Sequence, residues 1–390
     1  SYQSAMERGF FAAGVFGMID VENSRVVDDL TVEFVLKTPN AEFDRVVADP
    51  SGSIIKAGTT DFSETAIGTG PYIMEEWVAG VRTDLVRNDD YWGDPANLDR
   101  LELIEINDET ARINALMSGQ IDLAVNIPPF FADQLEAAPG FSIAYGSGTT
   151  APIIYMRQDT PPFDQLAVRQ AMRLAIDRQK CVDVALAGRG TVGNDLFGPT
   201  YPSYADDIPQ RSYDPEKARA ILDGAGIGEL DVELVTAPGV GMLECAAVFK
   251  ESAKPAGIDI SLRQVSAADI YNPESVYLQV PFGPSEWKGV SFQEHTRMSL
   301  LQSSYANETA NDAPAFDAAF AEAEATLDDA ERNAKYAALQ RELWDEGGYI
   351  VWGIQQEVTA FNDKIGGYET LAGPSIGFLP PGLDDLWIRP

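Results

Sequence analysis

Histidine and cysteine are scarce in this sequence of 390 residues, which holds one histidine and two cysteines. That count excludes a histidine-rich metal centre, because zinc and similar sites use several histidine or cysteine ligands. A Ser-His-Asp or Cys-His catalytic set would have to be built around His295. We therefore predict that His295 lies at the surface or at a pocket rim and takes no part in catalysis.

Basic residues are also few: 28 lysines and arginines stand against 61 aspartates and glutamates, for a formal net charge of −33. A surface of this charge repels nucleic acids and anionic lipids, so neither is an expected partner. The acids are spread along the chain and form no single acidic tail. Two interpretations stay open: a coat that maintains solubility, and an adaptation to salty surroundings, where screening weakens the repulsion.

Long apolar runs are missing as well, since the sequence contains no stretch of 18 or more apolar residues of the kind that spans a membrane as a helix. Residues 1–4 have neither the basic nor the apolar character of a signal peptide. We expect that any such peptide has been removed or lies outside this sequence.

The two cysteines, Cys181 and Cys245, fall in helix-like stretches, residues 177–187 and 241–250. Buried cysteines are common core residues, and a disulfide needs Cα atoms within about 7 Å of each other. Because two cysteines say little about pairing, we expect two separate core residues in preference to a disulfide, and no zinc site.

What the chain does have is a regular alternation of strand and helix patterns. Its length and its 45% hydrophobic content allow a large core and two or three domains. Strand patterns at 230–235 and 258–265 flank a helix pattern at 242–253, the spacing of a parallel pair with a right-handed crossover. Further strands are predicted at 32–36, 72–77, 101–106 and 276–280, and further helices at 108–118, 163–176, 215–226 and 317–347.

Six groups of residues, in order along the chain, resemble sequence motifs of one protein family. That family is the extracytoplasmic solute-binding proteins of family 5, the dipeptide and oligopeptide receptors of ABC importers. The groups are 27–41 (around DDLTVEF), 68–100 (GTGPY, RNDDYWG and LDR), 111–124 (ARINALMSGQIDLA), 161–178 (around VRQA and AIDR), 213–226 (around YDPEKA) and 328–350 (ending in GGYI).

The resemblance implies a fold. It is an α/β, two-lobed periplasmic-binding-protein fold, similar to type II, with mixed sheets flanked by helices. Lobe I would comprise residues 1–155 and 362–390 and lobe II residues 156–361, with the ligand cleft between the lobes and two crossing strands as the hinge. In the family, an opening segment of lobe I precedes the motif at 27–41. The N-terminal part of this lobe is therefore expected to be missing here.

The resemblance also implies a function. Family members are monomeric receptors, in the periplasm or tethered outside the membrane, that bind a peptide or a related small polar solute and deliver it to the permease subunits of an ABC importer. No enzymatic activity and no cofactor are implied. The alternatives are a non-peptide ligand (a sugar, an opine or a metal chelate), a receptor for a signalling partner, and a secreted hydrolase that uses some of the many carboxylates.

The candidate ligand wall is an aromatic and polar segment after the predicted strand 276–280. The family's segment that begins with Trp287 faces the ligand, and aromatic and amide groups are typical of binding pockets. Ordinary core packing is the competing interpretation. The predicted ligand-binding residues are Phe282, Ser285, Glu286, Trp287, Phe292, Glu294, Tyr305 and Asn307.

One position departs from the family pattern. In the peptide receptors an aspartate three residues after the tryptophan holds the ammonium group of the ligand, and here that position is Val290. A buried ammonium group without a carboxylate partner is costly. A simple dipeptide is therefore disfavoured unless Glu286 or Glu294 takes the place of the aspartate.

Overall fold

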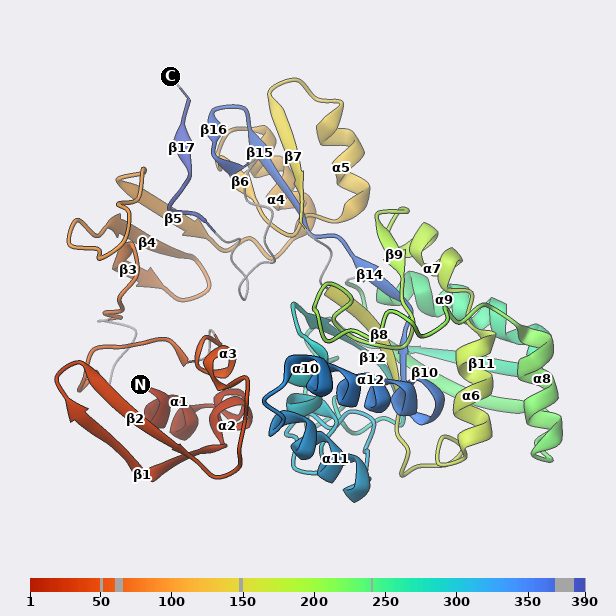
Figure 1. Cartoon of the computed structure of the whole chain (residues 1–390). Helices are drawn as coiled ribbons and strands as arrows, with labels where there is room; N and C mark the ends of the chain where they lie inside the picture. Colours follow the sequence, from red (N-terminus) through yellow and green to blue (C-terminus); the bar gives the residue numbers. More distant parts are fainter. Residues whose placement is uncertain (50–51, 60–65, 147–149, 240, 369–381, 390) are drawn as a thin grey trace. The chain divides into compact units, whose positions relative to one another are not determined.

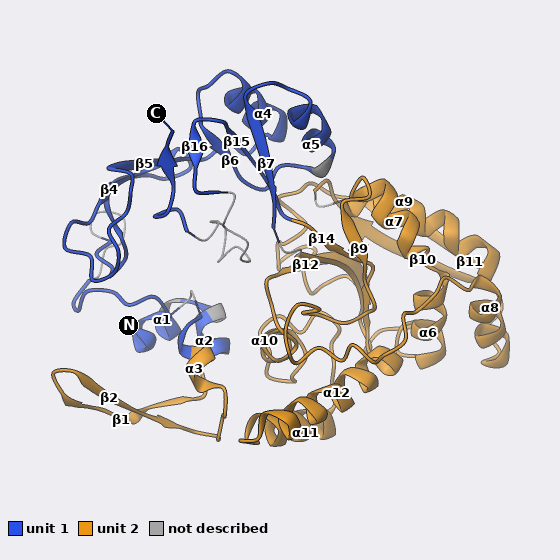
Figure 2. Ribbon diagram, turned by 45° about the horizontal axis from the view of Figure 1, so that its top comes forward, with its two compact units in different colours: residues 1–16, 47–148, 357–390 blue, residues 17–46, 149–356 orange. Residues whose placement is uncertain are grey.

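The computed structural model describes the chain except for residues 50–51, 60–65, 147–149, 240, 369–381 and 390. The chain divides into two compact units, coloured separately in Figure 2. Unit 1 comprises residues 1–16, 47–148 and 357–390, and unit 2 comprises residues 17–46 and 149–356. Residues 17–46 thus belong to unit 2, although the sequence assigned them to the first lobe. Part of the 362–390 assignment lies outside the described residues.

Unit 1 contains two three-stranded antiparallel sheets and a short ribbon (Figure 1). One sheet has the order β3-β4-β5 and the other β6-β15-β7, while β16 pairs with β17. The predicted strand after the GTGPY turn is confirmed as β3. The strand bounds are Tyr72–Val78 (β3), Arg82–Arg87 (β4), Arg100–Ile104 (β5), Leu123–Ala124 (β6), Phe141–Tyr145 (β7), Val358–Asn362 (β15), Ile365–Gly366 (β16) and Trp387–Ile388 (β17).

Helix α4 of unit 1 begins where the sequence supplies a cap. Asp108 accepts a hydrogen bond from the backbone nitrogen of Ala111 at 2.7 Å, which starts α4. Gly119, with φ +75°, follows the end of α4 in the left-handed conformation that glycine adopts without strain. The bounds are Tyr2–Arg8 (α1), Phe10–Phe16 (α2), Phe43–Val47 (α3, which crosses into unit 1 at its last residue), Glu109–Met117 (α4) and Pro129–Glu136 (α5).

Unit 2 is built on a five-stranded sheet whose central strand, β8, is buried along its whole length. β8 pairs antiparallel with β12, β13 and β14, and β14 pairs with β9. Residues 19–36 form a separate two-stranded hairpin. The strand bounds are Ile19–Asp28 (β1), Thr31–Leu36 (β2), Thr150–Met156 (β8), Gly190–Val192 (β9), Phe282–Lys288 (β12), Tyr349–Val351 (β13) and Gly353–Gln355 (β14).

The predicted strand–helix–strand unit is confirmed. β10 (Leu230–Thr236) and β11 (Ile258–Gln264) pair in parallel in an unbroken register, with α9 (Met242–Ala253) between them in the chain. Their apolar side chains join those of β8 in one core. The remaining helices of unit 2 are Leu166–Ala175 (α6), Arg178–Ala185 (α7), Pro215–Gly224 (α8), Phe292–Ser299 (α10), Pro314–Glu324 (α11) and Asp329–Glu346 (α12), with a 3₁₀ turn at Lys254–Ala256.

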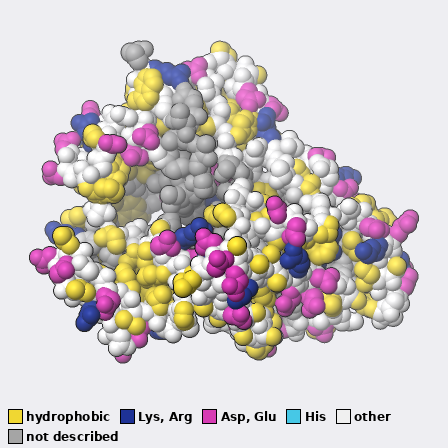
Figure 3. All heavy atoms as spheres, in the orientation of Figure 1, with side chains coloured by type: hydrophobic (Ala, Val, Ile, Leu, Met, Phe, Trp, Pro, Cys, Tyr) yellow, Lys and Arg dark blue, Asp and Glu magenta, His cyan; other side chains and the backbone are white. Residues whose placement is uncertain are grey.

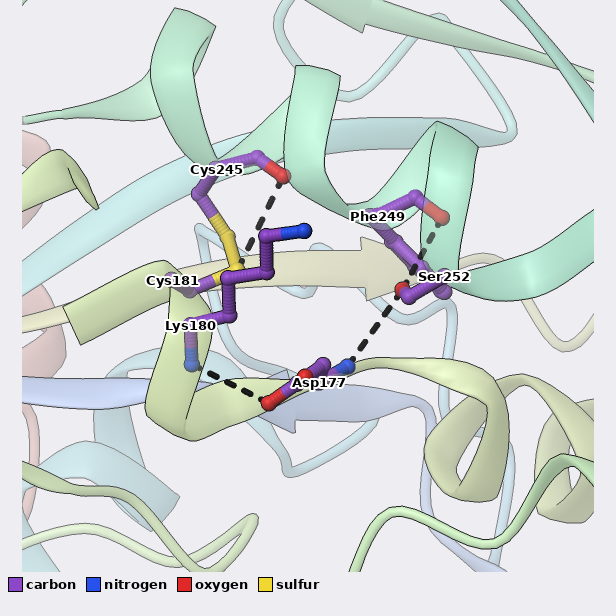
Figure 4. The surroundings of a disulfide bond; sticks show 6 residues. All are labelled: Asp177, Lys180, Cys181, Cys245, Phe249 and Ser252. Atoms are coloured by element: carbon purple, nitrogen blue, oxygen red, sulfur yellow. Dashed lines mark hydrogen bonds between the residues drawn. A yellow bond between two sulfur atoms is a disulfide. The ribbon is translucent and has the colours of Figure 1, made fainter. Parts of the chain in front are cut away.

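The two cysteines do form a disulfide, which corrects the expectation of separate thiols. Cys181 on α7 and Cys245 on α9 have Cα atoms 4.8 Å apart, and Figure 4 shows the bond that joins the two helices. Both residues are buried in the core that α6, α7 and α9 share with the sheet. Packing of these two helices brings together residues that are 64 positions apart, which the sequence pattern could not show.

Three arginines satisfy the C-terminal end of α12. They are Arg169, Arg173 and Arg211, and together they donate hydrogen bonds to the carbonyl oxygens of Leu343, Trp344, Asp345 and Glu346. The guanidinium group of Arg173 is fully buried, and burial lowers its pKa to about 9. These cations stand at the negative end of the helix dipole and pair with carbonyls that have no partner within the helix.

One local strand prediction was wrong. Residues 276–280 form turns instead of a strand: the backbone nitrogens of Val276 and Tyr277 both donate to Asn272, and Leu278 has φ +61°. Residues 190–192 form β9. A Cβ at Gly193, directly after β9, would lie 2.3 Å from the carbonyl oxygen of Val351 at the end of β13, so glycine allows the chain to pass close to this strand.

The acidic surface is dispersed, as the sequence indicated. On the face drawn in Figure 3, acidic side chains are scattered among apolar and basic ones without forming one block. Among the described residues, every helix is too short or too polar to cross a bilayer.

Candidate functional site

Strand β12 carries the predicted ligand wall and presents it on two faces. Side chains alternate along a strand, so Ser285 and Trp287 point to one side of the sheet, and Phe282 and Glu286 to the other. Cross-strand register places Tyr349 of β13 on the same side as Ser285 and Trp287. The predicted set is therefore split by the sheet.

We call the side of the sheet with Ser285 and Trp287 the first face. Side chains on this face make hydrogen bonds to one carboxylate, that of Glu308, in the loop between α10 and α11. Its side chain is fully buried. It accepts hydrogen bonds from Trp287 Nε1 at 3.0 Å, from the hydroxyl groups of Tyr349 and Tyr277 at 2.9 Å each, and from Ser285. Burial raises the pKa of Glu308, and the four hydrogen bonds oppose that rise. The arrangement holds the Trp287 ring in a fixed orientation.

The histidine is buried behind this wall, so the prediction of a surface or rim position was wrong. His295 on α10 has no exposed area and stacks on Phe197, with ring centroids 3.6 Å apart. It meets the rings of Trp287 and Tyr349 edge-on, at 4.9 and 5.1 Å. Neither of its ring nitrogens has a hydrogen-bond partner in the described part of the chain. Burial lowers the pKa of His295 well below its usual value, so the ring is held neutral.

Because this histidine is buried in its neutral form, we expect the stability of the folded protein to depend on pH. The unfolded chain takes up a proton at His295 below about pH 6.5, whereas the folded chain does not, so the stability is lost as the pH falls. Between pH 7.5 and 5.0 we expect the free energy of unfolding to drop by about 2 kcal/mol from this group alone. The substitution His295→Phe keeps the stacking on Phe197 and should remove this pH-dependent contribution to the free energy of unfolding.

Urea unfolding of the wild type and His295→Phe across this pH range isolates the effect, because all other titrating groups are common to both proteins. A difference between the two proteins that stays constant with pH would contradict the prediction.

The other predicted residues have structural contacts of their own. Phe282 packs in the core with Phe163 and Phe249, and Phe292 packs against Phe320 and Tyr336. Direct contact of these residues with a ligand stays a prediction.

Three polar or aromatic members lie in or next to α10. The Glu294 carboxylate accepts hydrogen bonds from Ser291 at 2.7 and 2.8 Å and closes the capping box of α10. The Asn307 amide donates to the carbonyl oxygen of Asn311 at 2.8 Å and so braces the loop that carries Glu308. Tyr305 is half-buried in the same loop.

Glu286 is half-buried near the end of β12, on the opposite side of the sheet from Trp287. Burial raises its pKa, and the ammonium group of Lys288 opposes the rise. A carboxylate of this kind becomes easier to ionise when a cationic group approaches it.

Sequence reasoning missed Glu308, Tyr277 and Tyr349. Glu308 is one of 61 acidic residues, and its partners lie 21 to 41 positions away, so no local pattern marks it. The described residues contain no group of three or more acidic, histidine or cysteine side chains that could hold a metal ion.

Comparison with known proteins places these features in a family. The family model described as bacterial extracellular solute-binding proteins, family 5, middle part, matches residues 1–309. The chain belongs to this family. The resemblance to this family is thus confirmed, with five of the six motifs inside the matched residues. The members of the family are binding proteins found outside the cytoplasm.

Two curated relatives show the range of family names. Di/tripeptide-binding protein 1 of Pseudomonas aeruginosa is 30% identical over 214 residues, which cover 52% of this chain and 40% of that protein. The nickel-binding periplasmic protein of Escherichia coli is 28% identical over 308 residues, which cover 73% of this chain and 58% of that protein. The chain therefore spans only about half the length of the curated relatives it matches.

Solved structures confirm the two-lobed fold of the family. The periplasmic binding protein DppA of Helicobacter pylori, in complex with the peptide STSA, matches with a TM-score of 0.83 at 22% identity. The match covers 97% of this chain and 76% of that chain.

Proposed function

We propose that this chain is the solute-binding receptor of an ABC importer, which binds a peptide or a related small polar solute and delivers it to a membrane permease. Family membership and the arrangement of β12 support the proposal. The single observation that carries it is the buried Glu308, which fixes Trp287 on the segment that the family turns toward its ligand. The proposed protein is a monomer with no enzymatic activity, periplasmic or tethered outside the membrane.

The disulfide supports a location outside the cytoplasm, because disulfides persist in oxidising compartments. The net charge of −33 supports the absence of nucleic acid among its partners.

For the ligand, we propose a solute that carries a cationic group, with Glu286 in place of the family's aspartate. The position three residues after Trp287 is Val290, and the carboxylate of Glu294 is engaged in the cap of α10. A metal chelate is the second candidate, because a relative whose alignment covers 73% of this chain is named as nickel-binding.

The ligand prediction concerns Trp287. We expect Trp287→Ala to abolish measurable binding, since a large aromatic side chain in a desolvated pocket is worth about 2 kcal/mol or more. Trp287→Phe keeps a ring but loses the hydrogen bond to Glu308, and it should bind with intermediate affinity. Trp92→Ala, at a tryptophan that is 81% exposed, is the control and should bind as the wild type does.

Thermal-shift screening of di- and tripeptides and of nickel chelates identifies the ligand, because a molecule that binds the folded state raises the melting temperature. Calorimetry with the best compound then tests the variants, well below their melting temperatures. Wild-type affinity in Trp287→Ala would remove Trp287 from the site, and a screen without any stabilising solute would contradict the receptor function.

We further propose that units 1 and 2 are the two lobes of the family fold and that ligand binding closes them. The chain passes between the units at 16/17, 46/47, 148/149 and 356/357, and the last two crossings lie within seven residues of the boundaries predicted for the hinge, 155/156 and 361/362. Small-angle scattering should give a smaller radius of gyration with saturating ligand than without it. An unchanged profile would contradict closure while leaving the binding proposal intact.

A further inference from the structure

A closed set of buried hydrogen bonds surrounds the first turn of α10 in unit 2. Gln293 Nε2 donates to both carboxylate oxygens of Glu42 at 3.2 and 3.3 Å, and Gln293 Oε1 accepts from Ser203 Oγ at 2.7 Å. Gln340 Nε2 donates to the carbonyl oxygens of Ser203 at 2.7 Å and of Tyr336 at 3.3 Å. The Tyr336 hydroxyl donates to Glu42 at 3.0 Å, which closes the set. We call these five residues the Glu42 network.

The Glu42 network lies out of contact with water, because all five of its side chains are buried. Glu42 is its one charged member, and Arg332 Nε lies 3.7 Å from the carboxylate. A buried donor that loses its acceptor costs more free energy than the bond contributes when it is made. The carboxylate of Glu42 therefore holds its two donors, Gln293 and Tyr336, in one arrangement.

Glu42 comes from a distant part of the chain, 251 positions before Gln293. It ends a short segment, residues 40–42, which we call the strap. Ala41 N donates to the carbonyl oxygen of Glu324 on α11 at 2.7 Å, and Asn40 Nδ2 donates to the Glu324 carboxylate at 3.0 Å.

The strap engages α10 at both ends of this helix. In the first turn the contact is the hydrogen bond from Gln293 to Glu42. In the last turn Arg297 pairs at 2.5 Å with the same carboxylate oxygen of Glu324 that accepts from Asn40. The position of α10 in unit 2 thus depends on a segment that is far from it in the sequence.

Helix α10 begins directly after the predicted ligand wall. Its N-cap, Ser291, is four positions after Trp287, and between them the carbonyl oxygen of Gly289 accepts from the Tyr201 hydroxyl. The indole of Trp287 also meets His295 of α10 edge-on, with ring centroids 4.9 Å apart. A shift of α10 would therefore change the surroundings of the Trp287 indole.

We propose that Glu42 is a positioning residue for the solute site. It holds Gln293 and so fixes α10, and α10 fixes the segment that carries Trp287. Without the carboxylate, Gln293 and Tyr336 keep buried donors without an acceptor, and the first turn of α10 moves to satisfy them. The consequence for solute affinity rests on the proposed function, whereas the effect on Trp287 can be measured without any solute.

The test is fluorine NMR of the whole chain with its six tryptophans replaced by 5-fluorotryptophan. The resonance of Trp287 is the one that is absent in Trp287→Phe. We expect Glu42→Ala to shift this resonance by more than its linewidth. Glu42→Gln keeps a carbonyl oxygen that can accept from the donors, so it should reduce the shift at least twofold. Glu331→Gln, which neutralises an exposed carboxylate on α12, is the control and should leave the resonance in place.

A milder variant covers the case in which Glu42→Ala does not fold. Asn40→Ala removes the hydrogen bond from the strap to the carboxylate of Glu324 and keeps the carboxylate of Glu42. We expect it to shift the Trp287 resonance in the same direction as Glu42→Ala does, by a smaller amount.

The coupling should also act in the opposite direction, because an energetic coupling between two sites is reciprocal. Amide hydrogen exchange at Ala41 reports how firmly the strap is bonded to Glu324. We expect Trp287→Ala to raise this exchange rate at least threefold. Trp92→Ala, at an exposed tryptophan of unit 1, should leave the rate unchanged.

Two results would overturn the proposal. If the Trp287 resonance stays in place in folded Glu42→Ala or Asn40→Ala protein, the Glu42 network stabilises the core without positioning the wall. If Trp287→Ala leaves the exchange rate at Ala41 unchanged, the strap and the wall are independent of each other. Either result would leave the receptor function standing, since the solute screen tests that function separately.

Discussion

Loss of the Cys181–Cys245 disulfide should lower the free energy of unfolding by about 2–4 kcal/mol. The bond joins α7 to α9 across a separation of 64 residues, and a cross-link over a loop of that length removes much conformational freedom from the unfolded chain. The double substitution Cys181→Ala and Cys245→Ala leaves two small side chains in the core and isolates the effect of the link.

Urea unfolding of the oxidised wild type, the reduced wild type and the double variant measures it. Reductant should shift the midpoint of the wild type and have no effect on the double variant, which serves as the matched control. If reductant leaves the wild-type midpoint in place, the bond contributes nothing to stability. Such a result would also weaken the argument for an oxidising compartment.

Glu308→Ala should cost about 3 kcal/mol or more, because four donors from the first face of β12 and its neighbours lose a common buried acceptor. The same change should weaken solute binding, since Trp287 loses the contact that orients its ring. Glu308→Gln keeps one carbonyl acceptor, so it should lower the stability and weaken solute binding less than Glu308→Ala does.

Glu251→Ala is the control for charge alone, because Glu251 is exposed on α9 and its removal should change stability by less than about 0.5 kcal/mol. Calorimetry and chemical unfolding together separate the two consequences for Glu308. A variant at Glu308 as stable as the Glu251 control would show that the network is dispensable for the fold.

Features written in a few neighbouring residues were predictable from the sequence. Asp214 followed by Pro215 marks the start of α8, and the side chain of Asp214 accepts from Lys217 N at 2.9 Å. The strand patterns on either side of α9 predicted the parallel β10–β11 pair, because two strands joined through a helix pair in parallel by a right-handed crossover.

Features that depend on distant contacts were not predictable. The pattern at 276–280 has the alternation of a strand, yet the backbone bonds to Asn272 turn the segment. His295 is a polar residue type that was expected at the surface. It is buried because the rings of Phe197 and Trp287 pack against it. Likewise the sequence drew attention to Trp287, but it did not show the carboxylate of Glu308 that accepts a hydrogen bond from its ring.

The central position of β8 has a consequence for the order in which the protein can be made. Ile153 pairs with Ser285 and with Val351, so the strand waits for partners 132 and 198 positions later in the chain. At synthesis rates of about 5–20 residues per second, the later partner emerges about 10–40 s after β8. During that interval β8, which is buried along its whole length in the folded protein, is without its neighbours. The central sheet of unit 2 therefore cannot be completed until Val351 has been made, and a holding chaperone would have to protect β8 until then.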